Sequence, residues 1–557
     1  MMTSDAPDTV HVDTSPSDHI QSGAVPATPT ASSTLPYSWS GFTQYAWKVR
    51  WEFLLSLVFL LLAFGQKLFS NTFSIDTEAI IQAQKNLYRS WIQLSRFGFV
   101  WLKKIAGTYW YNNALSGFLT VILFAATVFL WGYVFYALSE KKEKWHIAFF
   151  VIPLFVSPIM AEQLGFLLQS PSVCVGMMLV ALAVMTYVNA ASVRVHRESH
   201  RIRVTLAYHL LAILLLAAAF SLYTAQISLF ISAVGMVYVY KFFSSSSSTR
   251  KSEHSFTSFI LIPAALSICG YIIYSLLNRL ALYVYHTSTD AYVNDQVRWG
   301  KDSLYHIIVT ILRHARTVYF SQRIYYSLAF TVLGILLLLI LGIRFLCRRT
   351  PFSAVLIMAA VFASPLIMSV LLGMVPTVRT EFVYPYVFSF IFLLLHELLS
   401  VNSFLSFKWS QLLAWLVLLA VCFGQGQISN RIFYTESVIY QQDVLLASQL
   451  ATRIGEVTGM EHPSEPVVYI GRHIPRGNAD TYKSTDLDLI GRSIMDITFS
   501  TTHGDWVKNH FMAAQGYSFR MPSRAQESMA EQESLSMPRW PAEGSVQKIN
   551  GVIIVKF

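Results

Sequence analysis

Long apolar stretches alternate with short polar segments over most of the chain, starting near residue 50. Many of these stretches approach the roughly 20 residues that an α-helix needs to cross a bilayer. The pattern therefore predicts a polytopic α-helical membrane protein. The third stretch is short, and Pro153 and Pro158 predict that its helix is broken or tilted. We predict about 11 transmembrane helices, near 51–69, 115–138, 147–160, 172–191, 204–221, 226–240, 256–278, 326–346, 352–374, 383–399 and 410–428.

The two ends of the chain have different patterns. Residues 1–45 are polar, rich in Ser, Thr, Pro and Asp, and lack the apolar core of a signal peptide, which predicts a disordered tail. Residues 46–430 would form the transmembrane domain. Within 431–557, Asn550 and Gly551 separate two β-prone runs, a strong hairpin signal. We therefore predict a small C-terminal α/β domain, in which the polar run 524–540 is a loop.

The charged residues agree with a membrane protein and indicate its orientation. Only 13% of the 557 residues are charged, against about a quarter in soluble proteins. Five polar segments between the predicted helices together hold 14 Lys and Arg residues, whereas the short loops on the opposite side hold only Arg379. Because positively charged loops stay in the cytoplasm, we predict a cytoplasmic N-terminus, outward loops at 70–114 and 283–325, and an extracytoplasmic C-terminal domain. The net charge of +10 then requires no nucleic-acid partner.

The segment after the first predicted helix carries the most distinctive chemistry. It opens with two acids, Asp76 and Glu78, and continues as an amphipathic helix. At about 100° per residue, four cations fall along one edge of this helix, opposite an aliphatic and Trp edge. That arrangement is typical of a helix that lies in the bilayer interface. A carboxylate pair beside a row of cations at headgroup depth suits a lipid-linked phosphate. The four cations are Lys85, Arg89, Arg96 and Lys103.

Asp76 has two compatible interpretations. Its position before a helical run suits an N-cap, and Glu78 suits the positive end of the helix dipole. Alternatively, Asp76 is a general base whose pKa is raised towards the working pH by partial burial. Asp76 and Glu78 could also bind Mg²⁺ or Mn²⁺. No other cofactor is indicated, and the four cysteines have no metal-binding spacing.

Further polar residues lie in the predicted outward loops, close to helix ends. Ionisable groups at membrane depth are costly and usually line a cavity, although each of these residues could instead be an interfacial group that reaches into water. Arg379 is the best candidate for a phosphate clamp, because a guanidinium binds phosphate oxygens in pairs. The candidates for the substrate cavity are Glu162, Gln163, Tyr223, Gln226, Arg298, Trp299 and Glu381.

Several motifs occur in a characteristic order. They are SIDTE and LSRFG after the first helix, then SPxxAEQLGF, SLYTAQISL, NDQVRWG and VPTVRTEFVYP. Over residues 51–427 this pattern resembles the bacterial membrane glucosyltransferases that decorate O-antigen in serotype conversion, whose relatives act on Gram-positive cell-wall polysaccharides. The tail, with MPRWPAEGS before its hairpin, is similar to the Gram-positive or actinobacterial relatives.

The resemblance implies a glycosyltransferase C architecture in the bacterial cytoplasmic membrane, with the active site on the outer side. Such enzymes transfer a sugar, typically glucose from undecaprenyl-phosphate glucose, to a surface glycan with inversion. An acid in the first outward loop is their usual base, which here is Asp76, with Glu78 as partner or substitute. Arg96 and Arg379, with Arg89, would then bind the lipid phosphate.

A lipid or glycan transporter without transfer chemistry is the alternative function. The broken third helix and an outward cavity favour it. Three features count against it: the sequence has no obvious repeat between its two halves, no row of ionisable residues through the membrane centre and no phosphate-binding loop. The role of the C-terminal domain stays open between acceptor binding and a structural lid.

Overall fold

The computed structural model describes residues 35–107, 111–139, 146–194, 199–244, 256–401, 407–498 and 504–557. Residues Pro36–Phe557 form one compact unit. Most of the predicted disordered tail lies outside the described residues. The first helix, α1 (Trp39–Phe69), begins inside that predicted tail, because the Ser38 side chain accepts a hydrogen bond from the amide of Gly41 and caps it.

Within the described residues, nine helices are long and apolar enough to cross a membrane. An additional pair, α5 (Ala148–Val156) and α6 (Pro158–Gly165), is bent by 57° at the position where the two prolines predicted a break. Together with α16 (Val383–Val401), these helices correspond to all the predicted apolar stretches, so the predicted fold class is confirmed. The nine are α1, α4 (Asn113–Leu138), α7 (Ser170–Arg194), α8 (Ser199–Leu222), α9 (Gln226–Ser244), α10 (Phe256–Val284), α13 (Leu328–Leu346), α14 to α15 (Phe352–Leu372) and α17 (Phe407–Thr458).

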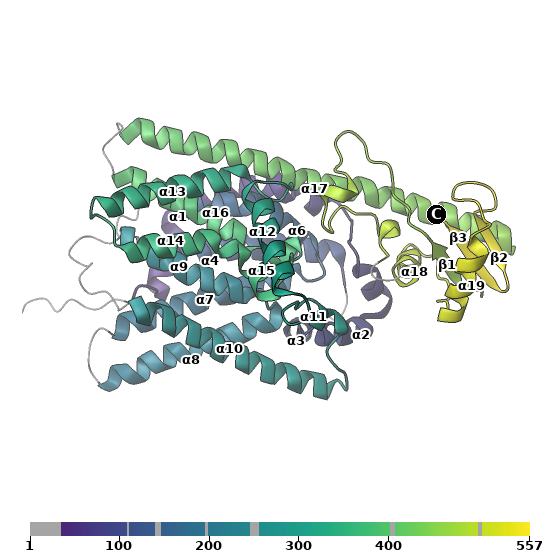
Figure 1. Cartoon of the computed structure of the whole chain (residues 1–557), viewed down its shortest axis with the longest axis horizontal. Coiled ribbons are helices and arrows are strands. Elements are labelled where there is room, and N and C mark those ends of the chain that lie inside the picture. The colour runs from purple at the N-terminus through teal and green to yellow at the C-terminus, as the bar shows by residue number, and fades with distance from the viewer. Residues whose placement is uncertain are drawn as a thin grey trace, which may run out of the picture. The chain divides into compact units, whose positions relative to one another are not determined.

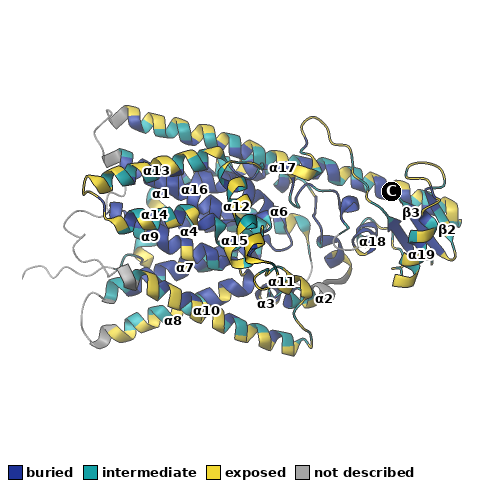
Figure 2. Cartoon of the chain, viewed as in Figure 1, coloured by how far each residue is buried: buried dark blue, intermediate teal, exposed yellow. Residues whose placement is uncertain are grey.

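The helices differ in how far they are buried (Figure 2). α5 is buried along its whole length, and α16 is buried at every described side chain except the partly buried Leu399, as expected for helices that are apolar all round. In contrast, α8, α10 and α13 expose many Leu and Ile side chains, a surface that suits contact with lipid. In Figure 1 the connection between α13 and α14 lies at the left, whereas the helices α2, α3 and α11 lie at the opposite end of the bundle.

The prediction of one continuous interfacial helix after Asp76 and Glu78 is wrong. It consists of α2 (Thr77–Gln93) and α3 (Phe97–Ile105), separated at Ser95, which has a left-handed backbone with φ 62°. Side chains of α10 stabilise the break, because Tyr274 donates to the Ser95 carbonyl and Asn278 donates to the Ser95 hydroxyl. Gly98 then permits close contact with α8, since a Cβ there would lie 2.3 Å from the Ser221 hydroxyl.

The predicted border between residues 430 and 431 falls inside α17. This helix has 52 residues, or about 78 Å at about 1.5 Å per residue, whereas the hydrocarbon core of a bilayer is about 30 Å thick. Roughly half of α17 therefore extends beyond a bilayer. It ends at Thr458 and is followed by Gly459 with φ 70°, a left-handed conformation that commonly ends a helix.

The part of the chain that follows α17, here called the C-terminal module, contains a three-stranded sheet of order β1-β3-β2. β1 (Val467–Ile470) is parallel to β3 (Val552–Lys556), and β2 (Val546–Ile549) pairs with β3 through the predicted Asn550–Gly551 hairpin. The predicted loop 524–540 contains a helix, α19 (Arg524–Ser534), which a capping box between Ser523 and Gln526 starts. α18 (Asp505–Ala514) packs on α2, so the module contacts the loop 70–114.

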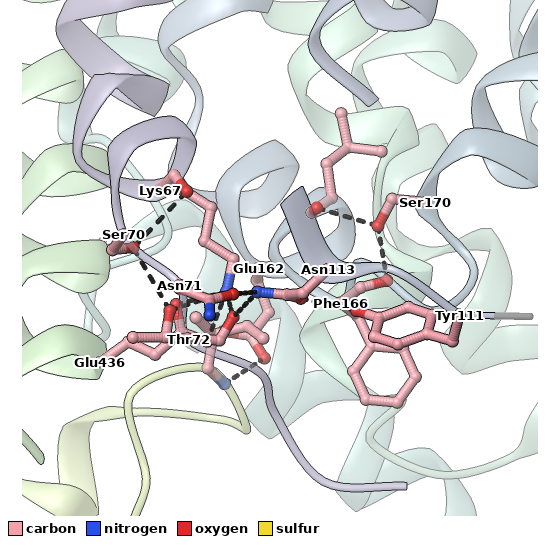
Figure 3. A network of polar contacts seen from close by, with 12 residues as sticks. Lys67, Ser70, Asn71, Thr72, Tyr111, Asn113, Glu162, Phe166, Ser170 and Glu436 are labelled. Carbon is pink, nitrogen blue, oxygen red and sulfur yellow. Dashed lines mark hydrogen bonds and ion pairs between the residues drawn. The ribbon is translucent and has the colours of Figure 1, made fainter. Parts of the chain in front are cut away.

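A buried ion pair fixes the segment that leads into α2 (Figure 3). The Lys67 ammonium at the end of α1 lies 2.7 Å from the Glu436 carboxylate of α17. It also donates to the Thr72 carbonyl, which accepts a second hydrogen bond from the Asn113 side chain at 2.8 Å. Phe73 packs between α17 and α18 through the Tyr440 and Phe511 rings. The loop before Asp76 is therefore held by both the membrane helices and the C-terminal module.

Replacing Lys67 by Met should lower the free energy of unfolding by about 3–5 kcal/mol, because Glu436 would remain as an unpaired buried charge. The double variant Lys67→Met/Glu436→Leu should recover most of that loss. Lys301→Met, which breaks the exposed pair with Asp295 at 3.2 Å, serves as the control and should cost at most about 1 kcal/mol. Unfolding in mixed detergent micelles measures all three. Equal losses of stability for Lys67→Met and Lys301→Met would contradict the conclusion that the Lys67–Glu436 ion pair fixes the segment before α2.

Candidate active site

Asp76 lies directly before α2 in an unusual backbone conformation. Its φ is 69° and its ψ is −20°, in the left-handed region, and its side chain makes no capping hydrogen bond. The predicted N-cap role of the side chain is therefore wrong. A non-glycine residue in this region stores about 1–3 kcal/mol of strain, and such residues cluster at functional sites. The clamped segment 70–75 on one side and α2 on the other maintain this conformation.

Two arginines from distant elements lie within electrostatic reach of the Asp76 carboxylate, namely Arg379 and Arg96. Arg96 follows the break at Ser95 and precedes α3, where its guanidinium donates to Gln169 at 3.1 Å and lies 5.1 Å from the centre of the Tyr223 ring. Arg379 lies in the short helix η3 (Val378–Thr380), 5.6 Å from the Phe166 ring centre. Burial and the neighbouring Arg379 lower the pKa of Arg96. Two adjacent guanidinium groups favour an anion between them.

The two acids of the SIDTE motif have different environments. Burial raises the pKa of Asp76, and the charges of Arg379 and Arg96 act in the opposite direction. Glu78 is fully buried, and neither of its carboxylate oxygens has a hydrogen-bond partner among the described residues. Burial, with the nearby charge of Asp76, raises the pKa of Glu78 well above its usual range. The neighbouring guanidinium groups therefore favour the ionised form of Asp76, whereas burial and the charge of Asp76 both disfavour the ionised form of Glu78.

The predicted Mg²⁺ or Mn²⁺ site does not fit this geometry. Hard divalent cations need several oxygen ligands, usually including ionised carboxylates. Here Asp76 faces two cationic side chains, and burial with the charge of Asp76 raises the pKa of Glu78, which disfavours its ionised form. In the described parts of the chain, no three His, Cys, Asp or Glu side chains form a group that could bind a metal.

Buried polar atoms without partners lie near the arginine pair. Gln163 of α6 leaves both side-chain polar atoms unpaired in the described structure, and the Tyr223 hydroxyl and one Gln226 oxygen are also unpaired. All three side chains are buried. An unsatisfied buried polar group costs about 1–3 kcal/mol, so these atoms are available to a polar ligand. Sugar hydroxyls would supply both donors and acceptors.

The C-terminal module reaches the same site. Glu162 of α6 accepts hydrogen bonds from the Leu489 and Ile490 amides at 2.9 and 3.1 Å, and from the Tyr325 hydroxyl at 3.0 Å. The Asp488 amide in turn donates to the Tyr325 hydroxyl at 2.8 Å. Asp488 thereby lies within electrostatic reach of Arg379. Glu162 is buried, so it is not an interfacial charge that reaches into water.

Glu381 supports Arg379 from a buried position. Its carboxylate lies 2.9 Å from the His314 ring and accepts a hydrogen bond from the Tyr326 hydroxyl at 2.6 Å. Because Glu381 directly follows η3, this network fixes the turn that carries Arg379. Glu381 is a positioning residue in this arrangement, and it too is buried rather than interfacial.

Three predicted site residues are not brought into this cluster. Arg298 forms an ion pair with Asp302, and the Trp299 ring donates to the Val370 carbonyl, so both stabilise the loop 283–325. Arg89 is exposed and lines a separate hollow of about 460 Å³ with His286. The break at Ser95 explains why Arg89 and Arg96 do not share one helix edge. The side chain of Lys85, predicted on that edge, lies outside the described residues.

Sequence reasoning missed Tyr292, Tyr325 and Asp488. Tyr292 of α11 (Ala291–Asp295) lies within electrostatic reach of both Arg96 and Arg379. Tyr325 contacts Glu162 although the two residues are 163 positions apart in the chain, and Asp488 lies further along the chain still. Such contacts have no local sequence signal, although Tyr292 lies in the aromatic and acidic loop that drew attention to Arg298 and Trp299.

Comparison with known proteins identifies the family. No curated protein and no solved structure matches the chain. The family described as Glucosyl transferase GtrII matches residues 65–396, a range that includes Asp76, Arg96, Glu162, Tyr223 and Arg379 but not Asp488. The resemblance predicted from the motifs is therefore confirmed, and the chain belongs to the GtrII family of glucosyl transferases, membrane proteins that use a sugar donor and a glycan acceptor.

Proposed function

We propose that the protein transfers a sugar, glucose by family membership, from a polyprenyl-phosphate carrier to a surface glycan. The donor class is inferred from the site's place at the end of the membrane helices. Arg96 lies in the segment that follows α1, and Arg379 lies in the turn directly before α16. Both are thus close to the ends of membrane helices, where the head of a membrane-bound isoprenoid would meet water. Undecaprenyl phosphate is the carrier that the bacterial resemblance implies.

Asp76 acts as the general base in the proposed reaction. It takes the proton of the acceptor hydroxyl, whose oxygen forms a new bond to the anomeric carbon while the bond from that carbon to the carrier phosphate breaks. The leaving polyprenyl phosphate carries the electron pair and the negative charge. A single displacement inverts the anomeric centre. The observation that carries this proposal is the placement of an ionisable acid beside two guanidinium groups in a strained backbone.

Arg96 and Arg379 stabilise the departing phosphate. Its negative charge grows as the glycosidic bond breaks, so fixed cations stabilise the transition state more than the ground state. The same cations keep the pKa of Asp76 lower than burial alone would set it. Gln163, Tyr223 and Gln226 would bind sugar hydroxyls. We place the site on the outer side of the bacterial cytoplasmic membrane, with a cytoplasmic N-terminus, because of the distribution of Lys and Arg.

Asp76→Asn should reduce transfer by about 10²–10⁴-fold, the usual contribution of base catalysis. Asn tolerates the left-handed backbone and has nearly the same shape, so folding and donor binding should persist. The assay supplies membranes with radiolabelled undecaprenyl-phosphate glucose and surface polysaccharide from cells that lack the protein. Labelled polysaccharide and free undecaprenyl phosphate are measured, and the latter distinguishes transfer from transport. Asp295→Asn, an exposed acid of α11, is the control. Near-normal transfer by Asp76→Asn would refute the assignment.

Arg379→Gln should shift the acid limb of the pH–rate profile to higher pH. The base works only when ionised, so activity rises as pH passes its pKa. Of the two arginines that lower the pKa of Asp76, Arg379 has the larger effect. Its removal therefore raises that pKa. Arg96→Gln should produce a smaller shift in the same direction, and Arg298→Gln should produce none. A limb that stays in place in Arg379→Gln would show that Asp76 is not the titrating base.

A further inference from the structure

A second hollow lies between α17 and the segment 471–497 of the C-terminal module. Its volume is about 690 Å³, which lies in the range of about 300–1,000 Å³ that is usual for ligand pockets. An adjoining hollow of about 500 Å³ is lined by residues near Arg323 and Tyr326. Asp486 lines both hollows. The two hollows therefore lie next to each other on either side of one residue, an arrangement that suits a polymer better than a compact small molecule.

The segment 471–497 is held in place by one face of α17. This segment contains only the short helices η4 (Ser484–Asp486) and η5 (Ile494–Asp496), and long segments without regular structure are often functional. The Arg431 guanidinium donates to three consecutive carbonyl oxygens, and the Asp443 carboxylate accepts from the Ser493 hydroxyl and the Ile494 amide at 2.7 and 2.8 Å. The hollow is therefore preformed, which lowers the entropic cost of binding.

The lining of the larger hollow suits a carbohydrate. Tyr482 presents a half-buried ring, stacked 4.4 Å from the Arg431 guanidinium. Around it lie an amide from Asn478, an ammonium from Lys483 and a carboxylate from Asp486. Both signs of charge are present, so the site does not select a simple anion, and this many polar groups disfavour an acyl chain. Sugars offer hydroxyls to such groups and C–H faces to an aromatic ring.

The same segment contacts the catalytic cluster through its other side. The Leu489 and Ile490 amides donate to Glu162, and Asp488 lies within electrostatic reach of Arg379. Only four residues lie between Lys483, which lines the hollow, and Asp488, which lies within electrostatic reach of Arg379. All residues that line the larger hollow lie outside the range that matches the family, 65–396. The larger hollow therefore lies outside the range that matches the family, and it is lined in part by the same segment that contacts Glu162 and comes within electrostatic reach of Arg379.

We propose that the hollow at Tyr482 and Asp486 is the binding site for the acceptor glycan, several sugar units from the hydroxyl that reacts. Segment 471–497 would hold the polymer on one face and direct its end past Asp488 towards Asp76. This inference rests on the proposed transferase function and assigns the C-terminal module its part in that function.

The test uses the full-length protein in detergent micelles and oligosaccharides cut from surface polysaccharide of cells that lack the protein. Tyr482→Ala and Asp486→Ala should each raise the acceptor KM about tenfold, the effect of losing roughly 1.4 kcal/mol of binding. The donor KM and the slow hydrolysis of undecaprenyl-phosphate glucose in the absence of acceptor should not change. Tyr482→Phe, which keeps the ring, and Asp480→Ala, an exposed acid of the same segment outside both hollows, are the matched controls.

Calorimetric titration of the same oligosaccharides separates this inference from the proposed function. Loss of oligosaccharide binding in the two variants, with unchanged thermal unfolding, supports the acceptor site even if the wild-type protein shows no turnover with this donor. If the wild-type protein turns over and the variants match it in acceptor KM and in binding, the acceptor site is refuted while the transferase stands. Weaker binding of the donor instead of the acceptor would also refute it.

Discussion

The site depends on the balance of charge around one partly buried carboxylate, that of Asp76. Burial raises the pKa of Asp76, and the two arginines act on the same group in the opposite direction. For Glu78, two residues further, burial and the nearby charge of Asp76 both raise the pKa. In the proposed reaction this balance suits Asp76 to act as the base, and the same arginines would bind the phosphate of the leaving group.

This balance is maintained by elements far apart in the chain. The segment before Asp76 is pinned through the Lys67–Glu436 ion pair, Arg96 is placed by the break at Ser95, and Arg379 is fixed through Glu381. The C-terminal module takes part twice, through α18 on α2 and through the amides that bind Glu162. It is therefore part of the construction of the site and not a separate appendage. A contact network of this kind makes the geometry rigid before substrate arrives.

The membrane fold could be predicted from the sequence because the length of the apolar stretches is a local signal. The SIDTE motif singled out Asp76 as a candidate, and the structure brings this residue within electrostatic reach of the predicted Arg96 and Arg379. The break at Ser95 was missed because its partners Tyr274 and Asn278 lie about 180 residues away. Asp488 was missed for the same reason, since only the fold brings it to Arg379. The helix α19 is different, because its capping box of Ser523 and Gln526 was visible in the sequence and could have predicted it.

The most direct test of the central claim is a structure of the protein with a phosphonate analogue of undecaprenyl-phosphate glucose, whose carbon–phosphorus bond resists transfer. The phosphonate oxygens should lie about 2.7–2.9 Å from the guanidinium nitrogens of Arg96 and Arg379, the distance of charge-assisted hydrogen bonds. The anomeric carbon should face Asp76, so that an acceptor hydroxyl that loses its proton to Asp76 can attack this carbon. A phosphonate bound elsewhere, for example in the hollow at Arg89 and His286, with Asp76 remote from the sugar, would contradict the account.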